Sequence, residues 1–457
     1  MQKLLLSILF TIGISILTWS QEQDDINVSG GIETFGYVAN EQLPFWTFTN
    51  TYGRLGPETN GLVYAFAKAD YALSPNSSIV IKASGVARDG IDPSVQRAEL
   101  YASFRNSWID ITIGSKDFTD NTYELSTVRR NILFSSNTRA LPGISIQNAA
   151  PITLFKNFSV DGTIAHFILN DDRFVDNVNV HYKNLYFNWD FNESSSVRFG
   201  LQHVAQWGGT SPLRGEQPDG FSDFTKIFFG KGGGENADFV DQANTLGNHI
   251  GSYSVTYKKR NTDAVDFDIY YQSLFEDRSG LELNNFPDGV WGISVSPKSS
   301  KLFKTFLYEY IQTTSQSGSP TAIENPGGQQ SGGDNYFVNG TYRSGWTYEG
   351  RTIGLPFISV FPNIDGVDPN TNNRSNAHHL GVAGSFWKLD YLLKLTYVEN
   401  LGTFAVPRTP KDTFVYSYFK TILPIDKIGI FSAEIGADFN EDSDTFFGAG
   451  VGYKYTF

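Results

Sequence analysis

One stretch of the chain combines aromatic and arginine side chains at a spacing that suits recognition of a sugar polymer. It runs from residue 336 to residue 351, and its candidate binding residues are Tyr342, Arg343, Trp346 and Arg351. Flat rings can cover the apolar C–H faces of sugars, and the planar fork of arginine matches carboxylates and phosphates. We therefore expect polysaccharide binding from this stretch, and we assign it no catalytic residue.

The chain contains few of the residues and motifs that cysteine chemistry, metal binding or catalysis would need. The chain has no cysteine, so it offers neither disulfides nor thiolates. His378 and His379 are neighbours and would point to opposite faces of a strand, so they cannot hold one metal ion together. No Gly-x-Ser-x-Gly, Walker-type or His-Glu-x-x-His motif is present. We expect no metal and no cofactor.

The composition narrows the class of protein and its partners. The net charge of -13 and the pI near 5.0 argue against a nucleic-acid partner. Aromatic residues make up 15% of the chain, which fits the aromatic girdles of a barrel at the two membrane interfaces. Beyond the N-terminal segment, no stretch reaches the eighteen or so apolar residues of a spanning helix.

The first twenty residues are typical of a secretory signal peptide. Lys3 precedes an apolar run from Leu4 to Leu17, and small residues follow the run. The run is short for a spanning helix of roughly 20 residues, so a cleaved signal is favoured over a membrane anchor. Cleavage after position 20 or 21 fits equally well. We expect a signal peptide over 1–20 and a mature chain over 21–457.

After residue 25 the dominant pattern has a period of two residues. In the segment 184–191, Leu, Phe, Trp and Phe occupy the odd positions. Similar runs cover 109–113, 265–272 and 390–397. Successive side chains of a strand point to opposite faces, so this pattern predicts strands with one apolar and one polar face.

These strands are expected to close into a transmembrane β-barrel. In lipid every backbone polar group needs a partner, which excludes an open sheet edge. With roughly 10 membrane residues per strand, the mature chain allows 16 to 18 strands. We predict an all-β, antiparallel barrel of about 18 strands in the outer membrane, with 16 strands as the alternative, and its lumen is wide unless loops fill it.

The last strand carries a further signal. Phe447, Val451, Tyr453 and Phe457 lie on one face of an alternating segment, and glycines fill much of the other face. A terminal strand that ends in Phe resembles the signal read by the barrel-assembly machinery. We expect this machinery and outer-membrane lipid as partners. Three segments are too long and polar for tight turns and are expected to form extracellular loops: 207–248, 313–335 and 361–376. Either they all lie on the surface, or one or more of them folds inward and constricts the lumen.

Four stretches resemble the Wzi family of outer-membrane capsule-assembly proteins. The most specific is Asp-Asn-Tyr-Phe-Val-Asn-Gly-Thr-Tyr-Arg-Ser-Gly-Trp-Thr-Tyr-Glu-Gly-Arg-Thr-Ile-Gly at 334–354. The others are Asn-Arg followed by Ala-His-His-Leu-Gly at 373–381, Ser-Asn-Thr-Arg-Ala-Leu-Pro-Gly at 136–143, and Gly-Leu-Gln-His with Trp-Gly-Gly at 200–209. They add Arg139 and Arg374 to the candidate binding residues.

The resemblance implies a plugged barrel that binds capsular polysaccharide at the cell surface, in the manner of a lectin and without catalysis. Better-known family members carry an N-terminal helical bundle in the periplasm. Here the segment Ile26 to Phe48 is more typical of strand and loop, so we do not expect that bundle.

Two questions stay open at this level. If the stretch around Trp346 is extended, its rings share one face and its arginines the other. The rings then face either a sugar or the lipid, and in the second case the arginines become the better binding residues. The function is also open between a polysaccharide-binding barrel, which the motifs favour, and a diffusion porin for carbohydrates. A barrel hydrolase or an adhesin-like protein is a third alternative.

Overall fold

The computed structural model describes residues 26–118, 123–233, 245–260, 264–276, 278–317, 334–363, 368–441 and 445–457. The expected signal peptide, residues 1–20, lies outside the described residues. None of the helices within these ranges is long and apolar enough to cross a membrane.

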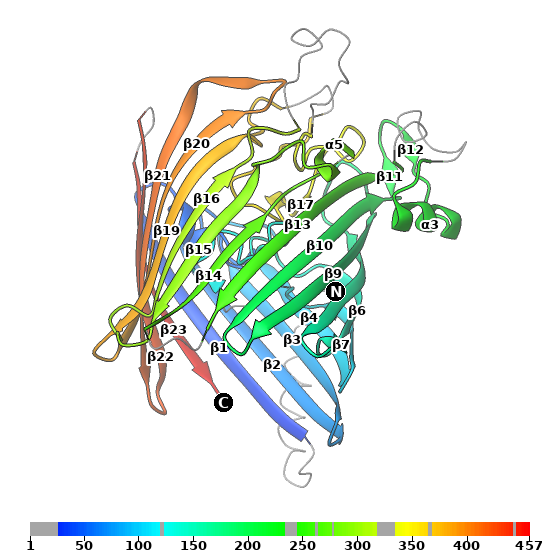
Figure 1. The fold of residues 1–457 in the computed structure, drawn as a ribbon. Helices are drawn as coiled ribbons and strands as arrows, with labels where there is room; N and C mark the ends of the chain where they lie inside the picture. Colours follow the sequence, from blue (N-terminus) through cyan, green and yellow to red (C-terminus); the bar gives the residue numbers. More distant parts are fainter. Residues whose placement is uncertain are drawn as a thin grey trace.

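Eighteen of the described strands close into one ring (Figure 1). Each strand is antiparallel to its neighbours, and the ring closes where Gly31–Ala39 pairs with Gly448–Thr456. The strands of the ring are β1 (Ile26–Ala39), β2 (Gly61–Ser74), β3 (Ser77–Arg88), β4 (Val95–Asn106), β5 (Ile109–Ser115), β6 (Pro142–Asn148), β8 (Phe158–Leu169), β9 (Val178–Asn192), β10 (Ser195–Trp207), β13 (Asn248–Lys259), β14 (Val265–Gln272), β15 (Gly289–Pro297), β16 (Thr305–Gln312), β19 (Ser375–Phe386), β20 (Leu389–Gly402), β21 (Pro407–Ile425), β22 (Gly429–Asn440) and β23 (Phe446–Thr456). The predicted closed, all-β barrel of about 18 strands is confirmed.

The other described elements are short. β7 pairs only with the start of β8, and the remaining strands form two small hairpins. They are β7 (Ile152–Phe155), β11 (Thr210–Ser211), β12 (Gly215–Glu216), β17 (Thr347–Tyr348), β18 (Arg351–Thr352), α2 (Phe45–Phe48), α3 (Phe221–Phe229) and α5 (Arg278–Leu281). The segment Ile26–Phe48 is thus a strand, a loop and one helical turn, as predicted.

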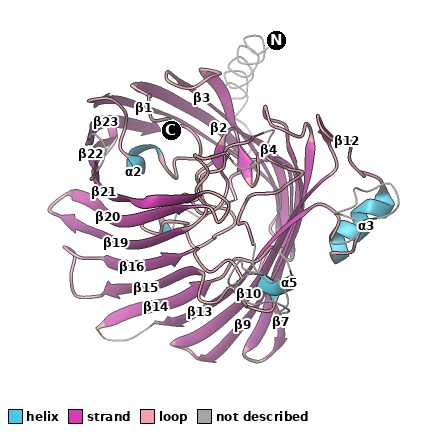
Figure 2. Ribbon diagram, turned by 90° about the horizontal axis from the view of Figure 1, so that it is seen from above, coloured by secondary structure: helices cyan, strands magenta, loops and turns pink. Residues whose placement is uncertain are grey.

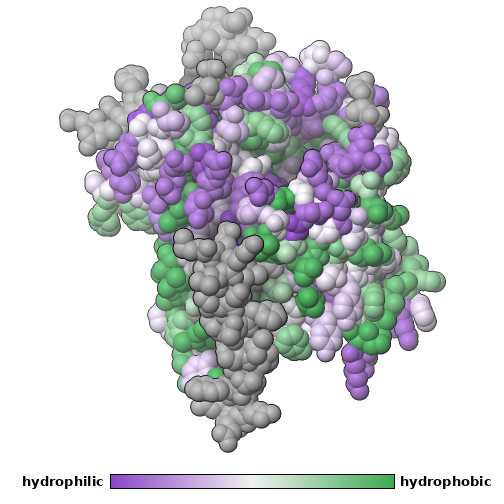
Figure 3. Space-filling view, turned by 180° about the vertical axis from the view of Figure 1, so that it is seen from behind, coloured by the Kyte–Doolittle hydropathy of each residue, from purple (hydrophilic) through white to green (hydrophobic). Residues whose placement is uncertain are grey.

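Side chains of the ring alternate between an outer and an inner face. Leu185 and Trp189 on β9, and Leu393 and Leu395 on β20, are 40% or more exposed, whereas Lys394 between the last two is 5% exposed. Figure 3 shows hydrophobic residues gathered over the lower part of the barrel and hydrophilic residues over the upper part. The period-two pattern of the sequence therefore separates a lipid-facing surface from the side chains that face the inside of the barrel.

The two ends of the barrel differ in the length of their connections. At one end two residues join β2 to β3, β9 to β10 and β19 to β20. The four longest connections lie at the other end and comprise residues 40–60, 116–141, 208–247 and 313–374. Two of the predicted loops, 313–335 and 361–376, belong to the single connection between β16 and β19.

The described parts of three long connections fill the interior of the ring (Figure 2). Trp46 comes from the 40–60 connection, Leu133 from the 116–141 connection and Trp346 from the 313–374 connection. Their exposed fractions are 2%, 0% and 0%. They belong to one apolar cluster with side chains of the inner wall. We term these segments the plug. Two of them, 40–60 and 116–141, were not predicted as long loops. They contain many apolar residues, whereas surface loops are usually polar.

Polar groups on the inner wall hold the plug in place. Glu309 on β16 is fully buried and accepts hydrogen bonds from Ser126 Oγ at 2.6 Å and from Thr127 N at 2.7 Å. His379 on β19 lies with Nε2 2.9 Å from the carbonyl oxygen of Leu125. A buried carboxylate without donors is costly, so the wall and the plug stabilise each other.

Candidate functional site

The stretch that the sequence marks for binding folds as a series of turns inside the plug. Gly345, Glu349 and Gly350 all adopt positive φ, at 65°, 54° and 72°. The last two form the turn between β17 and β18. Because the chain reverses at these points, the prediction of one extended face with all rings on it is wrong.

The predicted aromatic residues lie in the core of the plug. Tyr342 is 3% exposed and donates from its hydroxyl to Gly208 O at 3.2 Å. Trp346 is fully buried, donates from Nε1 to Leu133 O at 2.8 Å and meets Phe134 edge to face at 5.4 Å. These rings face neither a sugar nor the lipid. We therefore correct both expectations: Tyr342 and Trp346 pack the plug.

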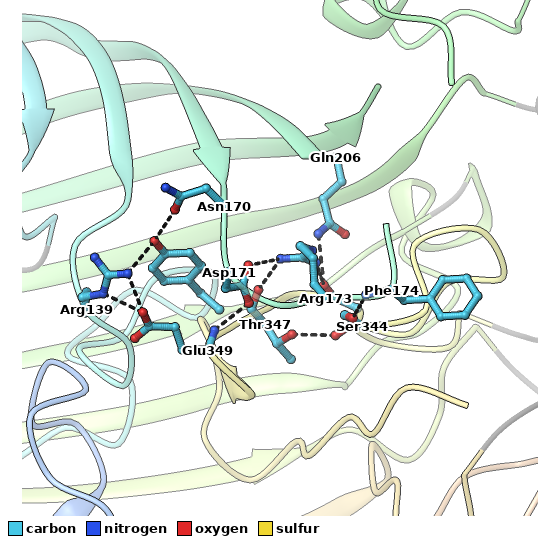
Figure 4. Close-up of polar contacts among 11 residues, drawn as sticks. Arg139, Asn170, Asp171, Arg173, Phe174, Gln206, Ser344, Thr347 and Glu349 are labelled. Carbon is cyan, nitrogen blue, oxygen red and sulfur yellow. Dashed lines mark hydrogen bonds and ion pairs between the residues drawn. The ribbon is translucent and has the colours of Figure 1, made fainter. Parts of the chain in front are cut away.

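Arg139 contacts the carboxylate of Glu349, and Arg88 and Arg351, from two other segments, lie near it; we term these three residues the arginine cluster. Arg139 donates from Nε to Glu349 Oε1 at 2.8 Å and forms an ion pair with it through Nη2 (Figure 4). Gln96 on β4 donates to the same oxygen at 2.6 Å and accepts from Arg88 Nη2 at 2.7 Å. The plug hairpin thus meets the wall through a charged network.

Arg351 brings the third positive charge of the cluster. Burial is the main reason why the pKa of Arg351 falls to about 10; the nearby Arg88 lowers it too, whereas Glu349 raises it. Arg351 Nη2 donates to Leu55 O. Its Nη1, and the Nε and Nη1 of Arg88, are buried without a hydrogen-bond partner in the described ranges. Arg97 on β4 adds a fourth guanidinium group near Glu349, and Asp171 adds a second carboxylate near Arg139, which leaves a local excess of positive charge.

A buried ion pair holds the hairpin that carries Glu349. Arg173 pairs with Asp171 at 3.2 Å and donates to Thr347 O at 3.1 Å and Gly345 O at 3.2 Å (Figure 4). Asp171 also accepts the backbone N–H of Glu349 at 2.8 Å. Burial lowers the pKa of Arg173, and the contact with Asp171 opposes this. The carboxylate of Glu349 is therefore fixed in position before any ligand arrives.

Water reaches the cluster at the hairpin turn. The Glu349 side chain is 26% exposed and that of Arg139 is 12% exposed. A Cβ placed on Gly350 would meet nothing within 4 Å, so this turn faces open space. The cluster lies at the end of β3 that leads into the β3–β4 connection, on the same end of the barrel as the long connections.

The last two predicted residues lie apart from the cluster. Arg343 donates from Nη1 to Asn363 O at 2.7 Å, with its guanidinium 5.3 Å from the ring centre of Phe174. Arg374, just before β19, covers the ring of Phe404 at 3.9 Å. The six predicted residues therefore divide among the plug core, the arginine cluster and two separate loop positions.

The arrangement suits binding of an anion. Arginine clusters recognise carboxylates and phosphates through paired hydrogen bonds, and burial strengthens such contacts. Within the ranges that the structure describes, no group of three or more His, Asp or Glu side chains could hold a metal ion. The sequence offered no signal for Arg88 or Gln96, because both come from wall strands far from the motif in the chain.

The chain matches known proteins in sequence pattern and in fold. A family model described as capsule assembly protein Wzi matches residues 91–358, more than half of the 457 residues. The structure resembles Wzi of Escherichia coli, described as an outer membrane protein involved in group 1 capsule assembly and a carbohydrate-binding β-barrel. That likeness has 12% identity and a TM-score of 0.60, and covers 93% of this chain and 84% of that one.

Two other solved structures share the barrel fold. OccK3 (OpdO) of Pseudomonas aeruginosa has 10% identity and a TM-score of 0.52, covering 95% of this chain and 96% of that one. OccAB2 of Acinetobacter baumannii has 11% identity and a TM-score of 0.50, covering 95% and 98%. No curated protein matches the chain in sequence. Identities this low carry the fold alone.

Proposed function

The chain belongs to the Wzi family of capsule assembly proteins, and from this premise we propose that it binds capsular or surface polysaccharide and helps to attach or assemble the capsule, as a lectin and not as an enzyme. It is an outer-membrane β-barrel. The Escherichia coli relative of the same fold is described as carbohydrate-binding, which supports this ligand class.

One observation carries the proposal: at a water-accessible turn of the plug, Arg139 is paired with Glu349, and two further arginines, Arg88 and Arg351, lie nearby. Glu349 occupies the place that the carboxylate of an acidic sugar would take beside Arg139. Arg88 and Arg351 add positive charge near this turn, and the groups that water reaches are those of Arg139 and Glu349. The ligand class that fits is an acidic polysaccharide with carboxylate or phosphate groups.

The direction of the barrel follows from its connections. Barrels of this class have short periplasmic turns and longer extracellular loops. We therefore place the end with the 40–60, 116–141, 208–247 and 313–374 connections outside the cell, with residues 21–457 forming the mature barrel. The cluster then faces the side on which capsule is held, and the plug opposes the diffusion-porin alternative.

The test measures binding of purified protein to two polymers, the uronate polymer alginate and neutral dextran. Arg139→Gln with Arg351→Gln removes two donors, each worth about 1.5–3 kcal/mol to a charged partner. We expect alginate binding to fall by about tenfold or more, with dextran binding unchanged. The loss should shrink as salt rises, because the Debye length falls from about 10 Å at 0.1 M to about 3 Å at 1 M.

Two further variants control this test. Glu349→Gln removes the internal competitor and should strengthen alginate binding at low salt. Arg105→Gln breaks the ion pair between Arg105, near the other end of β4, and Asp110 on β5. This variant should bind both polymers as the unaltered protein does. Each protein must keep its heat-modifiable folded form. If the double variant binds alginate as tightly as the unaltered protein, the cluster is not the site.

A further inference from the structure

The described part of the connection between β10 and β13, residues 208–233 and 245–247, carries a helix on the outside of the barrel. It leaves the barrel through the β11–β12 hairpin and places α3 outside the wall (Figures 1 and 2). Phe221–Phe229 reads Phe-Ser-Asp-Phe-Thr-Lys-Ile-Phe-Phe, with five aromatic or large aliphatic residues in nine. The plug and the arginine cluster make no use of this helix.

The outer wall changes character beneath α3. Leu185 and Phe187 on β9, and Phe199 and Leu201 on β10, are exposed and apolar, as lipid-facing residues should be. The next outward positions toward the long connections are polar, and they are His181, Lys183, His203 and, on β13, His249. Polar outward side chains are costly in hydrocarbon, so the change marks the edge of the lipid-facing band on these strands.

α3 lies directly over this edge. Ile227 is fully buried and forms a small cluster outside the barrel with Ala205, Trp207 and Leu246. Phe224, on the same side of the helix, meets the ring of Trp207 at 5.8 Å. One side of the helix is thus attached to the wall.

The remaining sides of α3 are divided by polarity. At 3.6 residues per turn, Phe221 and Phe228 lie on one side, and Asp223 and Lys226 lie on the opposite side. The centre of the Phe228 ring lies 4.2 Å from Lys183 Nζ. Lys183 is closer to the apolar band than His181, the preceding outward-facing residue of β9. The aromatic side therefore points toward the band, and the Asp223–Lys226 ion pair points away from it.

Two rings on the helix have no cover in the described part of the chain. Phe221 is 83% exposed and Phe229 is 69% exposed. A stable protein interface buries about 1,200–2,000 Å², whereas one phenylalanine buries about 150–250 Å². Two rings at the ends of a nine-residue helix are too small an area for a second copy of the chain. The surface that they continue is the lipid-facing wall.

We propose that α3 is an interfacial membrane helix, which inserts Phe221 and Phe229 among the acyl chains of the outer leaflet and anchors the barrel at that depth. Its occupant is lipid. Amphipathic helices of this kind lie in the membrane plane with the apolar face about 5–10 Å below the headgroups. The inference does not rest on polysaccharide binding, and it predicts no change in the arginine cluster.

The chain contains no cysteine, so one introduced cysteine gives one labelled position. Phe221→Cys and Lys226→Cys, five residues apart on opposite sides of α3, are each spin-labelled and reconstituted in phosphatidylcholine vesicles. Collision rates are measured with oxygen, which concentrates in lipid, and with a water-soluble nickel chelate. We expect the label at 221 to collide several-fold more with oxygen than with the chelate, and the label at 226 to show the reverse.

Three controls make the test decisive. Both proteins must show the heat-modifiable folded form, and Phe229→Cys repeats the measurement at the other exposed ring. A label at 221 that collides mainly with the chelate overturns the proposal. So does broadening of its spectrum that disappears when labelled protein is diluted with unlabelled protein, because that result assigns the surface to a second copy of the chain.

Discussion

At the scale of single residues, the same side-chain types serve packing or chemistry according to their burial. Trp346 and Tyr342 have the types expected of sugar-binding rings, yet each is enclosed and its polar atom is bonded to a backbone carbonyl. A buried ring loses its hydration and its access to ligand together. What remains available for recognition is charge, and it is concentrated around Glu349.

Trp346→Ala is the first prediction at this scale. Removing a fully buried tryptophan leaves a cavity between Phe134 and the wall, and such changes cost about 3–5 kcal/mol. Trp346→Phe keeps most of the buried area and loses only the bond to Leu133 O, about 1 kcal/mol. Urea unfolding in micelles, followed by fluorescence, measures both. Equal losses for the two variants would argue against the packing role.

The second prediction concerns Asp117, which follows β5 at the start of a plug segment. Burial raises its pKa to about 7, and the nearby Glu99 raises it too, while Arg54 and Lys82 lower it. The pKa of Asp117 is thus higher in the folded protein than in the unfolded chain. The contribution of Asp117 to the free energy of unfolding is therefore complete below about pH 4 and is lost as the pH rises to about 7.

Asp117→Asn should therefore flatten the fall in unfolding free energy between pH 4 and pH 7. The measurement is urea unfolding of both proteins across this range, with their difference plotted against pH. Parallel curves for the two proteins would show that Asp117 does not titrate in this window.

At the scale of elements, β23 closes the barrel. It pairs with β22 on one side and β1 on the other, and Phe457 exchanges two backbone hydrogen bonds with Gly30. Its outward residues Phe447, Val451 and Phe457 are 52% to 66% exposed. Both its hydrogen-bonding edges and its aromatic face are therefore in use.

Deleting residues 447–457 should abolish assembly in the outer membrane. The deletion leaves β1 and β22 with open edges, which lipid cannot satisfy. Cell fractionation and the heat-modifiable band measure the outcome. A truncated chain that still reaches the outer membrane in folded form would contradict the role assigned to the last strand.

At the scale of the whole molecule, the plug decides whether the barrel conducts. A barrel of about 18 strands leaves a wide lumen when nothing fills it. Here buried side chains of three connections occupy it, and Glu309 and His379 fix them to the wall.

Purified protein in planar bilayers should accordingly show little or no steady conductance. A variant in which a short Gly-Ser linker replaces residues 336–357 removes one plug segment and should conduct, provided that it keeps the heat-modifiable folded form. Large, stable channels from the unaltered protein would favour the diffusion-porin function over polysaccharide binding.

The sequence alone determined the barrel. Alternation depends only on which face of a strand a residue occupies, and this is local information that Leu185 to Phe191 or Phe447 to Phe457 carries without any partner. The length of the chain limited the number of strands to 16 to 18, since the thickness of the membrane sets the length of each strand. The stretches at 136–143 and 334–354 also pointed to Arg139 and Arg351, which the structure places near the same carboxylate, and their role in binding stays a prediction.

Only the tertiary structure decided what those residues face. Whether Trp346 is buried or exposed depends on a turn that folds its segment inward against Leu133, which is more than two hundred residues away in the chain. The arginine cluster exists because Arg139 in another connection contacts the carboxylate of Glu349, and Arg88 on the wall is linked to the same carboxylate through Gln96. Contacts of this kind join segments that share no local pattern, so no periodicity or spacing in the sequence could reveal them.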